Sequence, residues 1–152
     1  MGLEGEFFIV DDAELVEKLE LLGAGVKEDG KWKLPLVEAA YFQEKGAIDT
    51  GKSVGELIAG KEDLFTVLKQ LRDSGRIVRF GKGEAEFMRV YRKGIRVGED
   101  RTEGIIRVLK EGEKPDLLAD VAVAGKMRKE LTYAFVGEDG ITFVKAYRAG
   151  FE

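Results

Sequence analysis

The segment 75–91 constrains the fold more than any other part of the chain. Its sequence, GRIVRFGKGEAEFMRVY, contains two runs rich in β-branched and aromatic residues, 76–80 and 86–91, joined by a Gly-Lys-Gly turn. Such short runs on either side of a turn are typical of neighbouring strands. Gly75 can end a helix that comes before them. The segment therefore predicts a helix followed by two strands, with Tyr91 at the tip of the second strand.

The rest of the second half continues this alternation of helices and strands. Acidic residues begin the helix before Gly75, and Lys69 and Arg72 lie in its last turn, as the helix dipole favours. The motif Gly137-Glu-Asp-Gly140 predicts a hairpin turn. Further on we expect a strand at 104–109, a helix from Pro115 to about Lys129 with Leu117, Leu118 and Val121 turned inward, and strands at 131–136 and 141–147.

Residues 1–60 predict a smaller unit of the α/β type. We expect a strand at 6–10, a helix that Asp11 and Glu14 open as a capping box, and a hairpin at Asp29-Gly30. A second helix begins near Pro35, with a buried stripe of Leu36, Val37, Ala40 and Tyr41, and one more helical turn is expected at 54–59. We predict an α+β fold: a small N-terminal α/β subdomain at 1–60, then a C-terminal domain at 61–152 with a mixed β-sheet flanked by helices.

The composition excludes several kinds of chemistry. The 152 residues include no cysteine and no histidine, so disulfides, thiolate nucleophiles and the commonest general acid/base and transition-metal ligand are absent. No apolar run approaches the ~18 residues that a membrane helix needs. The first residues show no signal-peptide pattern, so we expect a cytoplasmic protein that does not bind membranes.

The charges are divided unevenly along the chain. Residues 1–70 carry a net charge of −7 with no arginine, whereas residues 71–152 carry +3 and all 10 arginines. Arginine suits bidentate contacts with phosphate and stacking on bases, which favours a nucleic-acid contact in the second half. The alternative is an ordinary surface on which the arginines form ion pairs with neighbouring acids.

Two further motifs have ordinary explanations. Residues 46–53, GAIDTGKS, match the phosphate-loop pattern GxxxxGK[ST], but an amphipathic helix comes before them where that motif needs a buried strand. A glycine-rich connection is the better interpretation. Carboxylate pairs such as Glu111/Glu113 and Glu84/Glu86 are better explained as solvated surface, so we predict no metal site and no cofactor.

Tyr91 has two possible roles. A tyrosine at the end of a strand is usually an amphipathic residue at the rim of the sheet. Arg101 in the next polar loop and Lys129 at the end of the last helix could, however, converge with Tyr91 on one edge of the sheet. The three residues are therefore the candidate functional site.

Four stretches resemble the archaeal tRNA-intron (splicing) endonucleases. Residues 34–46, LPLVEAAYFQEKG, resemble the family's LSLVEALYLLEKG helix, and residues 71–78, LRDSGRIV, resemble its DLRxRGyvV junction. Residues 87–91, FMRVY, resemble FRVY, and residues 125–129, GKMRK, resemble SVRK before an apolar strand. The resemblance covers about 34–148 and implies that residues 61–152 adopt the nuclease-like fold of that family's catalytic domain.

The resemblance implies a metal-independent cut of a bulge-helix-bulge RNA that leaves a 2′,3′-cyclic phosphate and a 5′-hydroxyl. The family uses a Tyr, His and Lys triad, and Tyr91 and Lys129 match its tyrosine and lysine. The place of the histidine holds Arg101, which cannot give up a proton near neutral pH. An arginine that the family often has seven residues before the lysine is replaced here by Ala122.

We therefore expect this chain to be a structural, non-catalytic subunit of the heterotetrameric type, two copies of which assemble with two catalytic subunits on precursor tRNA. The alternatives are an active endonuclease with an altered Tyr/Arg/Lys site, or an RNA-binding scaffold outside splicing. The expected RNA contacts are Arg89, Arg101, Arg128, Lys129 and Arg148. The expected subunit contacts are Glu138, Asp139 and Gly140 at a hairpin tip, which is otherwise a plain turn, and Phe143 and Tyr147 on one face of the last strand, which could instead be core.

Overall fold

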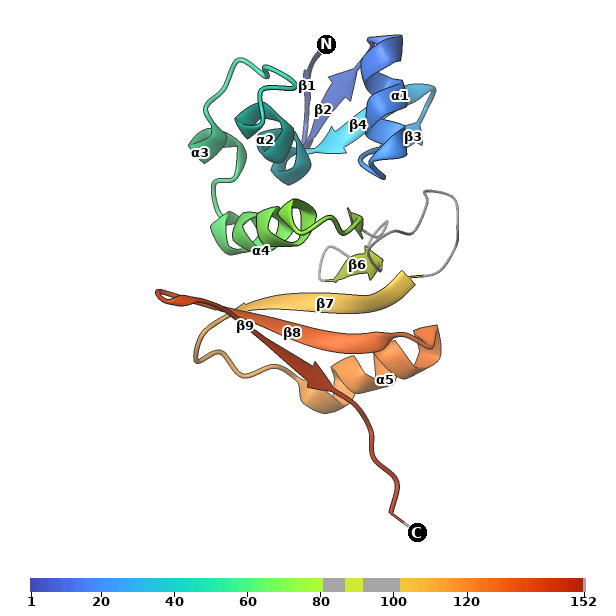
Figure 1. The fold of residues 1–152 in the computed structure, drawn as a ribbon, viewed down its shortest axis with the longest axis vertical. Helices are drawn as coiled ribbons and strands as arrows, with labels where there is room; N and C mark the ends of the chain where they lie inside the picture. The colour runs from blue at the N-terminus through green and yellow to red at the C-terminus, as the bar shows by residue number, and fades with distance from the viewer. Residues whose placement is uncertain (81–86, 92–101, 152) are drawn as a thin grey trace.

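The computed structural model describes residues 1–80, 87–91 and 102–151, and shows two β-sheets stacked with helices between and around them. In Figure 1 the N-terminal sheet and its helices lie at the top, helix α4 (Glu62–Asp73) crosses the middle, and the second sheet and helix α5 (Leu117–Met127) follow below. The helices and strands form a mixed α+β fold, as the sequence predicts.

The N-terminal layer is an antiparallel sheet in the order β1-β2-β4-β3. Its predicted hairpin at Asp29-Gly30 is confirmed, and Asp29 adopts a positive φ of 54° in the turn. Strand β1 has no counterpart in the sequence-based prediction. The strands are β1 (Gly2–Glu4), β2 (Phe7–Val10), β3 (Val26–Glu28) and β4 (Lys31–Pro35), and the helices are α1 (Ala13–Leu21), α2 (Leu36–Glu44) and α3 (Val54–Leu57).

The cap of α1 differs from the predicted one. Asp12, not Asp11, is the N-cap, and its carboxylate accepts hydrogen bonds from the backbone N–H groups of Glu14 and Leu15. Asp11 instead pairs with the N-terminal amine at 2.8 Å. The two adjacent aspartates cannot be told apart by spacing alone.

The second sheet has five strands in the order β5-β6-β7-β8-β9. All neighbouring pairs are antiparallel except β7 and β8, which run parallel because α5 carries the chain back across the sheet between them. The predicted turn at 81–83 lies outside the described residues. The strands are β5 (Val78–Phe80), β6 (Met88–Tyr91), β7 (Thr102–Lys110), β8 (Glu130–Gly137) and β9 (Gly140–Ala146).

Helix α4 is the centre of the largest core. Its buried residues Phe65, Val67, Leu68 and Leu71 pack between α2 on one side and the second sheet on the other. The same core takes in Val37, Ala40 and Tyr41 of α2 and Val78, Met88, Val90, Ile106 and Ala134 of the sheet. This core therefore contains residues from both sides of residue 60. The sequence predicts a boundary between two units at that residue, and the boundary stays a prediction.

Helix α2 is buried on more sides than the predicted stripe. Residues 37–42 are all buried, including the charged Glu38, whereas Leu36 is only partly buried. Glu38 is 2% exposed and accepts hydrogen bonds from Arg72 of α4 at 2.6 Å and from the backbone N–H of Gly25 at 3.2 Å. Burial raises the pKa of Glu38, and the guanidinium of Arg72 partly offsets that rise. A buried ion pair thus ties the N-terminal layer to α4.

Candidate functional site

The second sheet brings Tyr91 and Lys129 to the same end of its strands. Tyr91 ends β6 and pairs with Thr102 at the start of β7. One step further along the strands, Val90 pairs with Gly104, and Gly104 pairs with Glu130, the first residue of β8. Lys129 directly precedes Glu130, so only β7 lies between the end of β6 at Tyr91 and the start of β8 beside Lys129, and the two backbones are about 10 Å apart. Arg101, the third candidate, lies outside the described residues.

The end of α5 fixes where Lys129 enters the sheet. Arg128 adopts a left-handed backbone conformation, with φ 55° and ψ 43°, which reverses the chain. The N–H of Lys129 then donates to the carbonyl of Ala124 at 3.0 Å, and that of Arg128 donates to Gly125 at 3.2 Å. These bonds satisfy carbonyls that the end of a helix leaves unpaired. Lys129 is thereby held one residue before β8.

A buried polar network holds the middle of α5 against the sheet. Asp120, only 4% exposed, accepts two hydrogen bonds from Arg107 of β7, at 3.0 and 2.7 Å, and one from the hydroxyl of Tyr133 at 2.8 Å. The guanidinium of Arg107 also lies 4.2 Å from the ring centre of Phe87. Burial, together with the bond to Asp120, raises the pKa of Tyr133. Two strands and one helix are therefore fixed to one another by a single carboxylate.

Sequence reasoning missed this network, although a signal was present. Asp120 is the only charged residue in the apolar stretch 117–125, LLADVAVAG. A lone carboxylate in such a helix either faces solvent or has a buried partner. Arg107 on an apolar strand, IIRVL, was a possible partner.

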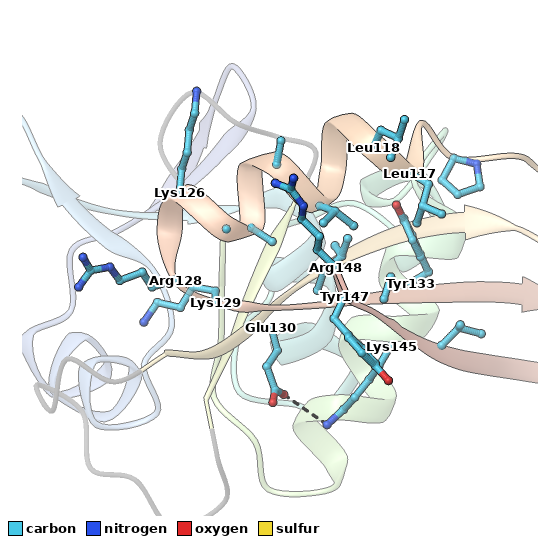
Figure 2. A pocket seen from close by; sticks show the side chains of 18 of the residues that line it. Leu117, Leu118, Lys126, Arg128, Lys129, Glu130, Tyr133, Lys145, Tyr147 and Arg148 are labelled. Atoms are coloured by element: carbon cyan, nitrogen blue, oxygen red, sulfur yellow. Dashed lines mark hydrogen bonds and ion pairs between the residues drawn. The ribbon is translucent and has the colours of Figure 1, made fainter. Parts of the chain in front are cut away.

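A hollow of about 1300 Å³ lies between α5, strands β8 and β9, and the C-terminal residues. Figure 2 shows the basic side chains of Lys126, Arg128 and Lys129 at one end of this hollow and Leu117 and Leu118 at the other. Arg148 also lines it, so three of the five predicted RNA-contact residues border one space. Arg89 lies elsewhere, on β6, and Arg101 is not among the described residues.

The predicted orientation of the start of α5 is wrong. Leu117 is 48% exposed and Leu118 is 84% exposed, so neither turns into the core. The helix faces the sheet instead through Asp120, Ala124 and the partly buried Val121. Periodicity places the apolar stripe incorrectly because nearly every position from 117 to 124 is apolar and either face could serve.

The predicted subunit contacts lie in three places. Glu138 and Asp139 are exposed at the tip of the β8–β9 hairpin, and Gly140 has a φ of +125°. Phe143 lines a second hollow on the α4 side of the sheet, with Leu71, Arg76 and Val90. Tyr147 follows the end of β9 and lines the hollow beside α5. That Phe143 and Tyr147 contact another subunit stays a prediction.

The phosphate-loop motif has its backbone groups bonded within the protein. The N–H of Thr50 donates to Gln43, that of Gly51 donates to Asp49, and the amide of Gln43 donates to the carbonyl of Lys52 at 2.6 Å. Ser53 caps α3 in a capping box with Glu56. Since a phosphate loop must offer its N–H groups to the ligand, this loop is a structural connection.

Within the described part of the chain, no group of three or more acidic side chains is arranged to hold a metal ion. Glu113 of the pair Glu111/Glu113 accepts a hydrogen bond from the backbone N–H of Lys110 at 2.9 Å. The pair Glu84/Glu86 lies outside the described residues. In the same part of the chain, no helix is long and apolar enough to cross a bilayer.

Residues 62–143 match the family model for the tRNA intron endonuclease, catalytic C-terminal domain. The matched region runs from the start of α4 into β9 and contains both Tyr91 and Lys129. The chain belongs to the tRNA intron endonuclease family.

Relatives named tRNA-splicing endonuclease extend the similarity beyond the matched domain. The protein of Thermococcus kodakarensis is 35% identical over 133 residues, covering 77% of this chain and 77% of the relative. That of Pyrococcus furiosus is 31% identical over 157 aligned residues, covering 89% and 90%. That of Methanothermobacter thermautotrophicus is 31% identical over 134 residues, covering 78% of each. The resemblance inferred from the sequence motifs is thus confirmed at the level of the family.

Proposed function

We propose that this member of the tRNA intron endonuclease family is the structural subunit of a heterotetrameric tRNA-splicing endonuclease. Two copies would assemble with two catalytic subunits and help to position bulge-helix-bulge introns of precursor tRNA. One observation carries the proposal: Tyr91 and Lys129 lie at one edge of the sheet inside the matched domain, yet none of the 152 residues is a histidine.

The missing histidine matters because of the chemistry of RNA cleavage. When the 2′-hydroxyl attacks the phosphate, the departing 5′ oxygen needs a proton from a general acid. Arg101 stands at the position that the family resemblance assigns to that acid, and a guanidinium with a pKa above about 12 does not release a proton at neutral pH. Loss of a general acid costs on the order of 10²–10⁴-fold in rate. Arg101 could hold a phosphate but would not complete the cut.

The surface beside α5 supports a role in an assembly. Several large apolar side chains are exposed there, and monomeric proteins rarely expose contiguous apolar patches. We place a subunit contact on this surface, with the exposed Glu138 and Asp139 at the hairpin tip reaching a basic site on a neighbouring subunit. The exposed residues that form the surface are Leu117, Leu118, Val144 and Tyr147.

The proposal is tested by reconstitution with a relative that carries tyrosine, histidine and lysine at the three positions. We expect the mixed complex to cut a bulge-helix-bulge RNA. In single-turnover reactions, Tyr91→Phe and Lys129→Ala in this chain should change the cleavage rate by less than about twofold, whereas the matching substitutions in the partner should lower it by about 10²-fold or more.

Three results would count against the proposal. An equal loss of rate on substituting Tyr91 would indicate an active, altered site in this chain. Failure to bind the partner, with RNA binding intact, would indicate a scaffold outside splicing. A partner that cuts equally well without this chain would remove the need for a structural subunit. Leu118→Glu, which places a charge on the proposed contact surface, should abolish assembly and leave the fold intact because the side chain is 84% exposed.

A further inference from the structure

Two arginines lie directly opposite each other on the edge hairpin of the second sheet. Arg79 of β5 pairs with Arg89 of β6. The pairs on either side, Val78 with Val90 and Phe80 with Met88, pack into the core around α4. Because side chains alternate along a strand, both arginines lie on the opposite face of the sheet. Their Cβ atoms are therefore about 5 Å apart, a spacing at which like charges destabilise a sheet.

Neither arginine forms an ion pair or a hydrogen bond with a carboxylate within the described residues. Arg72 and Arg107, by contrast, are bonded to Glu38 and Asp120 respectively. The charge of Arg79 helps to lower the pKa of Glu38, but no hydrogen bond or ion pair joins the two in the described part of the chain. Arg89 is exposed and Arg79 is partly buried. An anion between the two guanidinium groups would remove the repulsion and gain bidentate hydrogen bonds from both.

The position of the pair indicates which anion this is. Arg89 pairs with Ile105 of β7, and Ile105 pairs with Leu131 of β8, two residues beyond Lys129. Arg89 therefore lies two strands away from β8 and Arg79 three strands away, near the end of the sheet at which β6 ends with Tyr91 and β8 begins after Lys129. A chain of phosphates at regular spacing could contact both places, whereas a single small anion could contact only one of them.

We propose that Arg79 and Arg89 together bind one phosphodiester group of the RNA. This inference rests on the proposed function, since it takes precursor tRNA to be the ligand. It assigns to the β5–β6 edge a sequence-independent contact that helps to fix the register of the RNA. It also explains why two like charges face each other on an otherwise well-packed hairpin.

The test compares Arg79→Gln, Arg89→Gln and the double variant of the full chain. Binding of a fluorescent bulge-helix-bulge RNA is followed by anisotropy at several salt concentrations. We expect each single substitution to weaken binding about tenfold and to lower the slope of log K against log salt by about 0.7–0.9. The double variant should bind little worse than either single variant, because both side chains hold the same phosphate.

The thermal stability of the variants supplies a second readout. If the two arginines served only to stabilise the fold, replacing one of them should lower the Tm. Arg89→Gln should raise the Tm by about 1–3 °C, since it removes the repulsion, while it weakens RNA binding. The control is Lys27→Gln on β3, which removes one positive charge from an exposed side chain in the N-terminal layer and should change neither quantity.

Several outcomes would overturn the inference. They are unchanged RNA affinity in the double variant, a lower Tm for Arg89→Gln, equal competition by inorganic phosphate, and no RNA binding by the unsubstituted chain at about 50 mM salt. Normal RNA binding with lost assembly would assign the pair to an acidic protein segment instead. A different result would contradict the proposed function: a reconstituted complex that contains the unsubstituted chain and does not cut the RNA.

Discussion

Replacement of Arg72 by methionine should be among the most destabilising single substitutions on α4. The side chain of Arg72 is 6% exposed and that of Glu38 is 3% exposed, and the guanidinium also donates to the carbonyls of Leu22 and Val78 at 3.2 and 3.0 Å. Removing one partner of a buried ion pair leaves the other charge uncompensated, at a cost of about 3–5 kcal/mol. We expect Arg72→Met to lower the free energy of unfolding by that amount near neutral pH.

The variants that remove one or the other partner of this ion pair should differ in how their stability depends on pH. Without Arg72, the pKa of Glu38 rises further above its ordinary value of 4.5, so the folded state binds a proton that the unfolded state releases. The stability of Arg72→Met should therefore fall as the pH rises from about 5 to about 8, and its cost should be smaller in acid. Glu38→Gln leaves a buried arginine that cannot deprotonate, so the stability of this variant should hardly change over that range.

The assay is urea unfolding followed by circular dichroism and by the fluorescence of Trp32, the only tryptophan. The matched control is Lys69→Met, because Lys69 on the same helix pairs with Glu44 of α2 at an exposed site. Its effect should be much smaller than that of Arg72→Met. The double variant Glu38→Leu/Arg72→Met should recover part of the loss, because Arg72 Nε has no partner among the described residues and the pair is imperfectly satisfied. Equal costs for Arg72→Met and Lys69→Met, or equal pH dependence of the two single variants, would refute this reasoning.

Three other predictions concern parts of the structure outside this pair. Asp120→Asn should cost about 3 kcal/mol because it removes the buried negative charge that accepts two hydrogen bonds from Arg107. Tyr133→Phe should cost about 1 kcal/mol because it removes one hydrogen bond to Asp120, and equal costs by urea unfolding would contradict this. Burial and the bond to Asp73 raise the pKa of Tyr41 from 10.0 to about 12, so the native chain should lose roughly 2–3 kcal/mol of stability between those pH values relative to Tyr41→Phe, which has nothing to titrate. Finally, a fluorescent ATP analogue should not bind in the presence of magnesium, and saturable binding abolished by Lys52→Ala would show that the loop at 46–53 does hold phosphate.

Much of the fold was predictable because local signals and tertiary packing agree. Helix α4 has acids in its first turn, Arg72 in its last turn and a clear apolar face, and it forms where expected. Both predicted hairpins, at Asp29-Gly30 and at Gly137 to Gly140, are present, and Gly30 and Gly140 adopt the positive φ that these turns need. In each case, interactions between residues close together in the sequence were sufficient to predict the element.

The errors arose where a distant contact decides the structure. Glu38 looks like a surface residue of an amphipathic helix, but Arg72, 34 positions away, makes its burial possible. The exposed side of α5 could not be chosen from an almost wholly apolar sequence, and the bonds of Asp120 to Arg107 and Tyr133 determine it. Strand β1 consists of three residues and, among the described strands, pairs with β2 alone, so it carries little signal of its own.

The candidate site was predictable in part. The motifs at Tyr91 and Lys129 indicated the family, and the register of β6, β7 and β8 brings these residues to one edge of the sheet. The hollow beside α5 could not be predicted, because it depends on how the helix packs against β8 and β9. The opposed pair Arg79 and Arg89 is likewise visible only in the strand register.

The central claim is that this chain keeps part of the family's site but lacks the group that protonates the leaving oxygen. The most direct measurement is a single-turnover cleavage assay of the purified chain alone, in excess over a labelled bulge-helix-bulge RNA, with detection of 2′,3′-cyclic phosphate ends. We expect no product above the uncatalysed background. A cyclic phosphate product that forms with the chain alone and disappears in Tyr91→Phe would contradict it.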